Sequence, residues 1–178
     1  LDLQVERAEA TVRQIMEQGG SAIAVAVDIT SPTDVQKAVN TAVEAFGGVH
    51  ILVNNAAITH REGLLEVTLE QWNQVLDVIL TGTFLCSRYV AERMIAQGGG
   101  GAIVNIASTS GHRGGRGAIA YATAKGGLLN LTRSLAVQLA PHKIRVNSVT
   151  PTQTGIPVGG SQPRAAGAKP KNIPLGRY

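Results

Sequence analysis

The chain has 178 residues, of which 44% are hydrophobic and 16% charged, and its formal net charge is +4. This length and apolar content predict one globular domain with a buried core. A single cysteine, Cys86, excludes a disulfide framework and a cysteine-rich metal site, and it is typical of the reducing cytoplasm. No apolar run approaches the roughly 20 residues of a membrane span. Aromatic residues make up only 3% of the chain, too few for base-stacking platforms. We therefore expect a cytoplasmic protein that binds neither membranes nor nucleic acids.

The charges are distributed unevenly along the chain. All twelve acidic residues lie at or before Glu92, whereas eleven of the sixteen Lys and Arg residues lie at Arg93 or beyond. A basic second half is one expectation for a protein that binds an anionic partner. The alternative, which we favour, is that the chain is a piece of a longer one whose other parts carry the balancing acids.

The first half of the chain alternates helical and strand patterns. Residues 1–20 predict the end of a strand and then an amphipathic helix that stops at a glycine pair. The side chains expected to face inward from this helix are Val5, Ala8, Val12, Ile15 and Met16. The apolar run 21–28 predicts a strand that ends at Asp28. A helix is expected to begin at Pro32, after Thr30 or Ser31, and the run 49–55 predicts the next buried strand.

The second half continues this alternation. A helical pattern runs from residue 69 to about 96, with an interruption expected near 81–82. The glycines at 98–101 follow a helix and precede a strand, which is the wrong order for a phosphate-binding loop, so we interpret them as a flexible connection. Residues 101–108 predict a strand, 118–139 a helix and 143–150 the last clear strand. Buried strands that alternate with helices predict a doubly wound parallel α/β sheet with helices on both faces.

Three residues are candidates for catalysis. Tyr121 and Lys125 are four positions apart in a helical pattern, so both project from one face of the helix, a turn apart. Ser108 is expected at the carboxyl end of the strand before this helix. A phenol titrates near pH 10, but a nearby ammonium group favours the phenolate. A Ser108 hydroxyl could then hold a substrate oxygen while Tyr121 gives or takes its proton.

A Tyr-x-x-x-Lys pair on a helix is common and by itself is usually structural. Here it follows a strand, a serine and a glycine-rich loop, with thirteen positions from Ser108 to Tyr121. This combination resembles the active site of the short-chain dehydrogenases/reductases, which interconvert alcohols and ketones with a nicotinamide cofactor. The resemblance implies that Tyr121 is the acid/base and that Ser108 orients the carbonyl oxygen. It also implies that Lys125 promotes ionisation of Tyr121 and binds the nicotinamide ribose.

The same resemblance extends over essentially the whole chain and implies the cofactor-binding residues. Asp2 matches the acidic residue that accepts hydrogen bonds from the adenosine ribose and repels a 2′-phosphate, which favours NAD over NADP. Asp28 and Ile29 match the pair that contacts the adenine. The other positions implied to bind the cofactor are Asn54, Asn55, Ala56, Ala57, Tyr121, Lys125, Pro151 and Thr154.

The family comparison also implies the organisation of the protein. Residues 1–178 would form a single, partial dinucleotide-binding and catalytic domain with a Rossmann-like fold, and residues 152–178 a flexible loop region on the substrate side. The substrate would be a small alcohol or ketone, and the full-length parent a homodimer or homotetramer. The family's first strand, its glycine-rich pyrophosphate turn and its last strand have no counterpart in the chain. Because that first strand lies inside the sheet, we expect no ladder hydrogen bonds between the strand ending at Asp28 and the strand ending at Asn54.

Three positions depart from the family pattern. Ile79 stands where the family has an asparagine that holds a water in the proton relay, and isoleucine has no hydrogen-bonding group. Ala57 and Thr152 replace glycines and would crowd the cofactor if the backbone needs a positive φ there. Together with the absent pyrophosphate turn, Ile79 favours a second hypothesis, a non-catalytic fragment or pseudoenzyme that acts only as a binding partner. A third, a nucleic-acid-binding module, has the basic second half in its favour but no recognised motif. The histidines have no metal-ligand spacing, so no metal site is expected.

Overall fold

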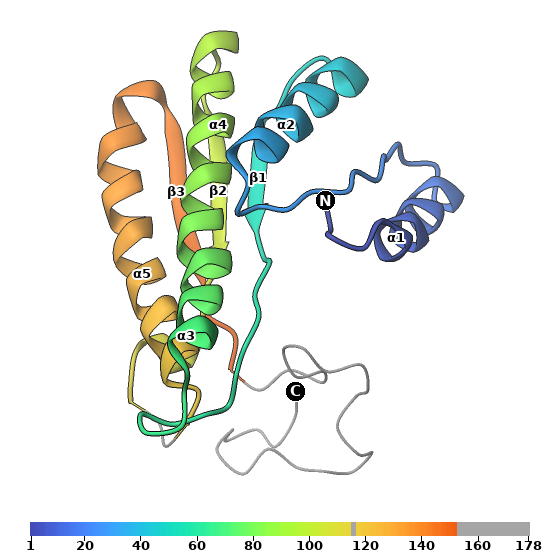
Figure 1. Ribbon diagram of the computed structural model, residues 1–178. Coiled ribbons are helices and arrows are strands. Elements are labelled where there is room, and N and C mark those ends of the chain that lie inside the picture. The colour runs from blue at the N-terminus through green and yellow to red at the C-terminus, as the bar shows by residue number, and fades with distance from the viewer. Residues whose placement is uncertain (115–116, 153–178) are drawn as a thin grey trace, which may run out of the picture.

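In the part of the chain that the structure describes, the sheet has three parallel strands. The computed structural model describes residues 1–114 and 117–152 (Figure 1). The strands β1 (Ile51–Asn54), β2 (Gly101–Ile106) and β3 (Ile144–Val149) lie side by side in the order β1-β2-β3. In this register Asn54 is the partner of Asn105. Parallel strands need crossover connections, and helices supply them here, as the sequence predicted.

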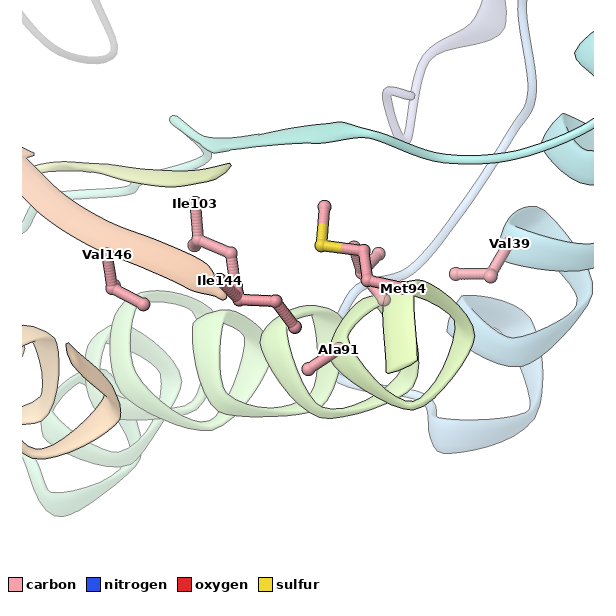
Figure 2. Packing of buried hydrophobic residues seen from close by; sticks show 7 residues of the cluster. Val39, Ala91, Met94, Ile103, Ile144 and Val146 are labelled. Carbon is pink, nitrogen blue, oxygen red and sulfur yellow. The ribbon is translucent and has the colours of Figure 1, made fainter. Parts of the chain in front are cut away.

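Three helices cover one face of this sheet, namely α2 (Pro32–Phe46), α4 (Gly82–Gln97) and α5 (Ile119–Leu139). Figure 2 shows the core that results, in which Val39 and Met94 from the helices pack with Ile103, Ile144 and other buried side chains of the strands. Successive side chains of a strand point to opposite faces. Ile51 and Val53 of β1 therefore point away from this core, and both are more than half exposed. The sequence predicted helices on both faces of the sheet. Among the described residues, helices cover the face that carries this core.

Local signals mark both ends of α2, and its start is the predicted one. Ser31 is the N-cap, and its Oγ accepts a hydrogen bond from the Asp34 backbone N–H at 3.3 Å. Pro32 occupies the first helical position. Gly47 ends the helix with a φ of 81°, a left-handed conformation that costs glycine little. Local side-chain chemistry therefore sets both boundaries of this helix.

The long helix predicted from residue 69 contains a π-helical turn. It consists of α3 (Leu69–Leu76), a π turn η1 (Asp77–Thr81) and α4, so the predicted interruption lies slightly earlier than 81–82. A capping box between Thr68 and Gln71 begins α3. Ile79, within the π turn, is fully buried among apolar residues of α3 and α5. Its side chain is therefore part of the core between these helices.

The N-terminal helix forms as predicted but is not buried. The helix α1 (Val5–Glu17) forms, and the chain turns at Gly19 with a φ of 79°. However, none of its residues is buried; Ile15 and Met16, predicted to face inward, are 39% and 55% exposed. Figure 1 shows α1 standing away from the three strands, so the described sheet does not cover these side chains.

The prediction of a strand over residues 21–28 is wrong. A single parallel bridge joins Ala26 to Asp2, through hydrogen bonds from Asp2 N to Val25 O and from Val27 N to Asp2 O. A strand needs a succession of such pairs, and this segment has one partner residue among the described positions. As expected, no ladder joins it to β1 in the described part of the chain. Val27 is nevertheless buried, because the segment packs on α2 and α4.

Two short 3₁₀ turns, η2 (Thr109–Gly111) and η3 (Ala140–His142), flank α5. Among the described residues, no helix combines the length and apolar character that crossing a membrane requires.

The variant Ile79→Asn is expected to lower the free energy of unfolding by about 3 kcal/mol, because it removes buried apolar surface and places an amide without partners in an apolar cluster. Urea denaturation of the variant and the unmodified protein measures this loss. The control Ile79→Val, which stays apolar, is expected to cost about 1 kcal/mol. Equal stability of Ile79→Asn and the unmodified protein would contradict the packing described above.

Candidate active site

A cavity of about 740 Å³ lies at the carboxyl ends of the parallel strands. The segments that follow β1, β2 and β3 all reach this edge of the sheet, where open α/β sheets generally bind their ligands. Every predicted site residue in the described part of the chain lines this cavity: Asp2, Asp28, Ile29, Asn54, Asn55, Ala56, Ala57, Ser108, Tyr121, Lys125 and Pro151. Thr154, predicted as a cofactor contact, lies outside the described residues, as do positions 153–178 of the predicted loop region.

Several lining residues were missed from the sequence, among them Arg7, Val78, Thr83 and Cys86. Val78 lies in the π turn, and Thr83 and Cys86 follow it on α4. A π turn adds a residue to the helix and shifts the faces of the turns after it, so a regular 3.6-residue period misassigns them. Cys86 is 6% exposed, and burial raises the pKa of its thiol to about 11. It therefore packs as a small hydrophobic residue.

Ser108 stands two residues beyond β2, in the predicted place. Its Oγ accepts a hydrogen bond from the Ser110 backbone N–H at 3.1 Å, which orients the side chain at the start of η2. The preceding residue is also anchored, since Ala107 N donates to Val149 O at 2.8 Å. A hydroxyl that accepts one hydrogen bond can still donate its own proton. Ser108 can therefore donate a hydrogen bond to an oxygen atom in the cavity.

The start of α5 is held by backbone groups. Its N-cap, Ala118, has a φ of 55°, and no side chain caps the helix. The carbonyl of Arg61 accepts from Ala118 N at 3.1 Å, and the carbonyl of Glu62 accepts from Ile119 N at 3.4 Å. A side chain at Gly111 would lie within 2.7 Å of the Lys125 carbonyl group, so only glycine allows η2 to pack this closely on α5. These contacts fix the first turns of α5, which carry Tyr121, against the cavity.

Tyr121 and Lys125 lie on the same face of α5, as their spacing predicted. The Lys125 Nζ is 5.6 Å from the centre of the Tyr121 ring. Lys125 is only 2% exposed, and its Nζ donates a hydrogen bond to the carbonyl of Ile106 at the end of β2. Burial lowers the pKa of Lys125 to about 8, because the charged form loses its hydration. The cavity thus places a phenol ring near a nearly enclosed amine.

Two exposed carboxylates lie at the N-terminal side of the cavity. Asp2 Oδ1 accepts a hydrogen bond from Gln4 N at 2.8 Å. Asp28 Oδ1 accepts from the Thr30 hydroxyl at 2.7 Å and from Thr30 N at 2.9 Å, and these bonds lower the pKa of the Asp28 carboxyl. Each carboxylate keeps acceptor positions for the hydroxyl groups of a ligand. The bridge between Asp2 and Ala26 brings both to the same region.

The two substitutions of family glycines cause no backbone strain. Among the described residues, Ala118 and Lys143 are the only non-glycine residues with a positive φ. Ala57 and Thr152 therefore adopt conformations open to any L-amino acid, and both line the cavity. The crowding considered from the sequence does not arise from their backbone geometry.

The chain resembles known proteins over most of its length. A family model described as short chain dehydrogenase matches residues 1–164. An uncharacterized oxidoreductase of Thermotoga maritima is 44% identical over 147 residues, covering 83% of this chain and 56% of the relative. A 3-oxoacyl-[acyl-carrier-protein] reductase of Synechocystis is 39% identical over 144 residues, covering 81% of this chain and 58% of that relative.

Solved structures agree with this assignment. The crystal structure of a short-chain type dehydrogenase/reductase from Mycobacterium marinum superposes with a TM-score of 0.80 at 35% identity. The match covers 83% of this chain and 59% of the other. The fold is therefore the Rossmann-like α/β fold of that structure. The chain spans less than three fifths of the length of these matched proteins.

The free energy of unfolding is expected to rise with pH because of Lys125. Its pKa of about 8 in the folded state lies below the ordinary value of 10.5, so the unfolded state binds more protons between these two values. Between about pH 7 and about pH 9.5, the free energy of unfolding of the unmodified protein should rise by about 2 kcal/mol more than that of the Lys125→Met variant.

Urea denaturation at the two pH values measures this difference, with Lys37→Met as a control at an exposed lysine of α2. The control should keep the pH dependence of the unmodified protein. An identical rise in the Lys125→Met variant would show that Lys125 is not buried in solution.

Proposed function

The chain belongs to the short-chain dehydrogenase family, and from this premise we propose that the protein containing it interconverts a secondary alcohol and a ketone with a nicotinamide dinucleotide cofactor. The observation that carries the proposal is that one cavity is lined by Ser108, Tyr121 and Lys125 together with the carboxylate of Asp2. The named activity of the Synechocystis relative, reduction of a 3-oxoacyl group, is a reaction of this class.

The residues present fit a dinucleotide. The Asp2 carboxylate has acceptor positions for two adjacent ribose hydroxyls, and its negative charge disfavours a phosphate there, which supports NAD over NADP. Asn55, Ala56 and Ala57 follow β1 and line the same cavity. Lys125 would donate to the hydroxyls of the nicotinamide ribose from the opposite side of the cavity. The cofactor supplies the hydride chemistry when bound.

The chain's own residues would handle the proton. Tyr121 Oη would give its proton to the substrate oxygen in reduction and take it back in oxidation. The Lys125 amine lies 5.6 Å from the centre of the Tyr121 ring, and a pKa of about 8 leaves it mainly protonated at pH 7. The Ser108 hydroxyl would donate to the same substrate oxygen and orient it toward Tyr121.

A second candidate function is a non-catalytic binding partner. The observation in its favour is the complete burial of Ile79 in an apolar cluster, because its side chain provides no polar group for a proton relay. On this reading the cavity would bind the dinucleotide without turnover. Calorimetric titration with NAD, combined with an assay of a panel of secondary alcohols, separates the two functions: binding with turnover supports the enzyme, and binding without turnover supports the alternative.

The variant Tyr121→Phe is expected to reduce turnover by about 100-fold or more while NAD affinity changes less than about twofold, because only the transferable proton is lost. Steady-state assays of the whole protein and calorimetry measure the two quantities. The control Tyr89→Phe alters a half-buried tyrosine of α4 outside the cavity and should preserve both. Undiminished turnover in Tyr121→Phe would exclude this tyrosine as the acid/base.

The variant Asp2→Ala is expected to reduce the preference for NAD over NADP by about tenfold, because a carboxylate near a 2′-phosphate is removed. The comparison variant Asp2→Asn keeps an acceptor for Gln4 N and isolates the effect of charge. Dissociation constants for both cofactors give the ratio. Equal affinity of the unmodified protein for NAD and NADP would contradict the role assigned to Asp2.

A further inference from the structure

Four polar side chains form a continuous hydrogen-bonded chain from the cavity to α5. Asn54 lines the cavity, and its Nδ2 donates to Asn105 Oδ1 at 2.9 Å and to Ser87 Oγ at 3.1 Å. Asn105 Nδ2 donates to Thr132 Oγ1 at 2.9 Å. The Thr132 hydroxyl donates in turn to the carbonyl of Leu128, one turn earlier in α5, at 2.8 Å. We define these four residues, Asn54, Ser87, Asn105 and Thr132, as the buried polar network.

The hydrogen bonds of this network have a defined direction. The Leu128 carbonyl can only accept, so the Thr132 hydroxyl gives it the proton and must itself accept from Asn105. Asn105 therefore turns its Nδ2 toward Thr132, and its Oδ1 faces Asn54. Because Asn105 is 0% and Thr132 6% exposed, water cannot easily replace a lost partner. An unpaired buried amide is costly, so removing one hydroxyl disturbs the whole arrangement.

The network joins the same two elements as the lysine. Thr132 follows Lys125 by seven residues, two helical turns, so both lie on the side of α5 that faces β2. Their partners are neighbours on β2, since Thr132 contacts the Asn105 side chain and Lys125 contacts the Ile106 carbonyl. Two contacts along one helix face restrict both the rotation and the sliding of that helix. Tyr121 lies one further turn along this face and is subject to the same restriction.

We propose that Thr132 is a positioning residue: through Asn105 it holds the face of α5 that carries Tyr121 and Lys125 at its place beside the cavity. The inference rests on the proposed function for its catalytic consequence, but the placement of Lys125 is independent of turnover. Loss of the Thr132 hydroxyl leaves Asn105 Nδ2 without an acceptor. The amide then rotates or moves away, and α5 loses a polar contact with the end of β2 that lies beside the Lys125–Ile106 contact.

The test compares Thr132→Val, which keeps the shape but lacks the hydroxyl, with Thr132→Ser, which keeps the hydroxyl. Thr41→Val is the matched control, because Thr41 also donates to a carbonyl one turn earlier, Lys37 O at 3.0 Å, but lies on α2 outside the cavity. The first readout needs no cofactor: lysine acylation by a small reagent, followed by mass spectrometry. Lys125, at 2% exposure, should be strongly protected relative to the exposed Lys37 and Lys143.

Thr132→Val is expected to raise the acylation rate of Lys125 about tenfold relative to those two lysines, whereas Thr132→Ser and Thr41→Val leave it unchanged. In the whole protein, kcat should fall about ten- to hundredfold in Thr132→Val with KM within about twofold, since misplacement affects the reacting groups more than binding. Thr132→Ser should restore kcat. The pair Thr132→Ala and Thr132→Ser, which differ by the hydroxyl alone, gives the same comparison should the valine variant fail to fold.

Unchanged Lys125 acylation in a folded Thr132→Val or Thr132→Ala variant would overturn the proposal. An equal rise at Lys37, Lys125 and Lys143 would also overturn it, because that pattern indicates general destabilisation. Selective exposure of Lys125 in a protein without turnover would support the positioning role and contradict the proposed enzymatic function, so the two failures are distinguishable.

Discussion

The enclosure of the Lys125 ammonium between α5 and the end of β2 is the constraint on which the rest of the site depends. A buried charge is costly unless it is hydrogen-bonded, and the described partner of Lys125 Nζ is the carbonyl of Ile106. That carbonyl is available because it lies at the end of a strand. The position of β2 therefore sets that of the lysine, and the helical spacing then sets that of Tyr121, whose ring is 5.6 Å from Nζ.

The remaining parts of the site are brought to this pair by the sheet. In a parallel sheet the strands end at one edge, so residues after β1, β2 and β3 meet although they are far apart in sequence. The register of β1 on β2 places Asn54 beside Asn105, and the buried polar network extends that pairing to Thr132 on α5. The cavity lining and α5 are thus joined through the interior by hydrogen bonds as well as by apolar packing.

The π turn between α3 and α4 changes which side chains serve the cavity. It directs Ile79 into the apolar cluster with Val75 and Leu128, while the adjacent Val78 lines the cavity. A proton path through the side chain at position 79 is therefore absent. In the proposed reaction, the protons exchanged at the substrate oxygen are those of the Tyr121, Lys125 and Ser108 side chains, which line the cavity.

The eleven described positions that the family resemblance implied for the site line one cavity. The sequence by itself determined the start of α2 after Ser31, the three strands and the Tyr121–Lys125 spacing, because caps and periods are local. It could not show that residues 21–28 form a single bridge, since a strand depends on a partner elsewhere in the fold. Nor could it show the exposure of Ile15 and Met16, which depends on what packs against α1. The Asn105–Thr132 bond and the burial of Lys125 were decided by tertiary structure alone, because they join residues of different elements whose contact follows from packing.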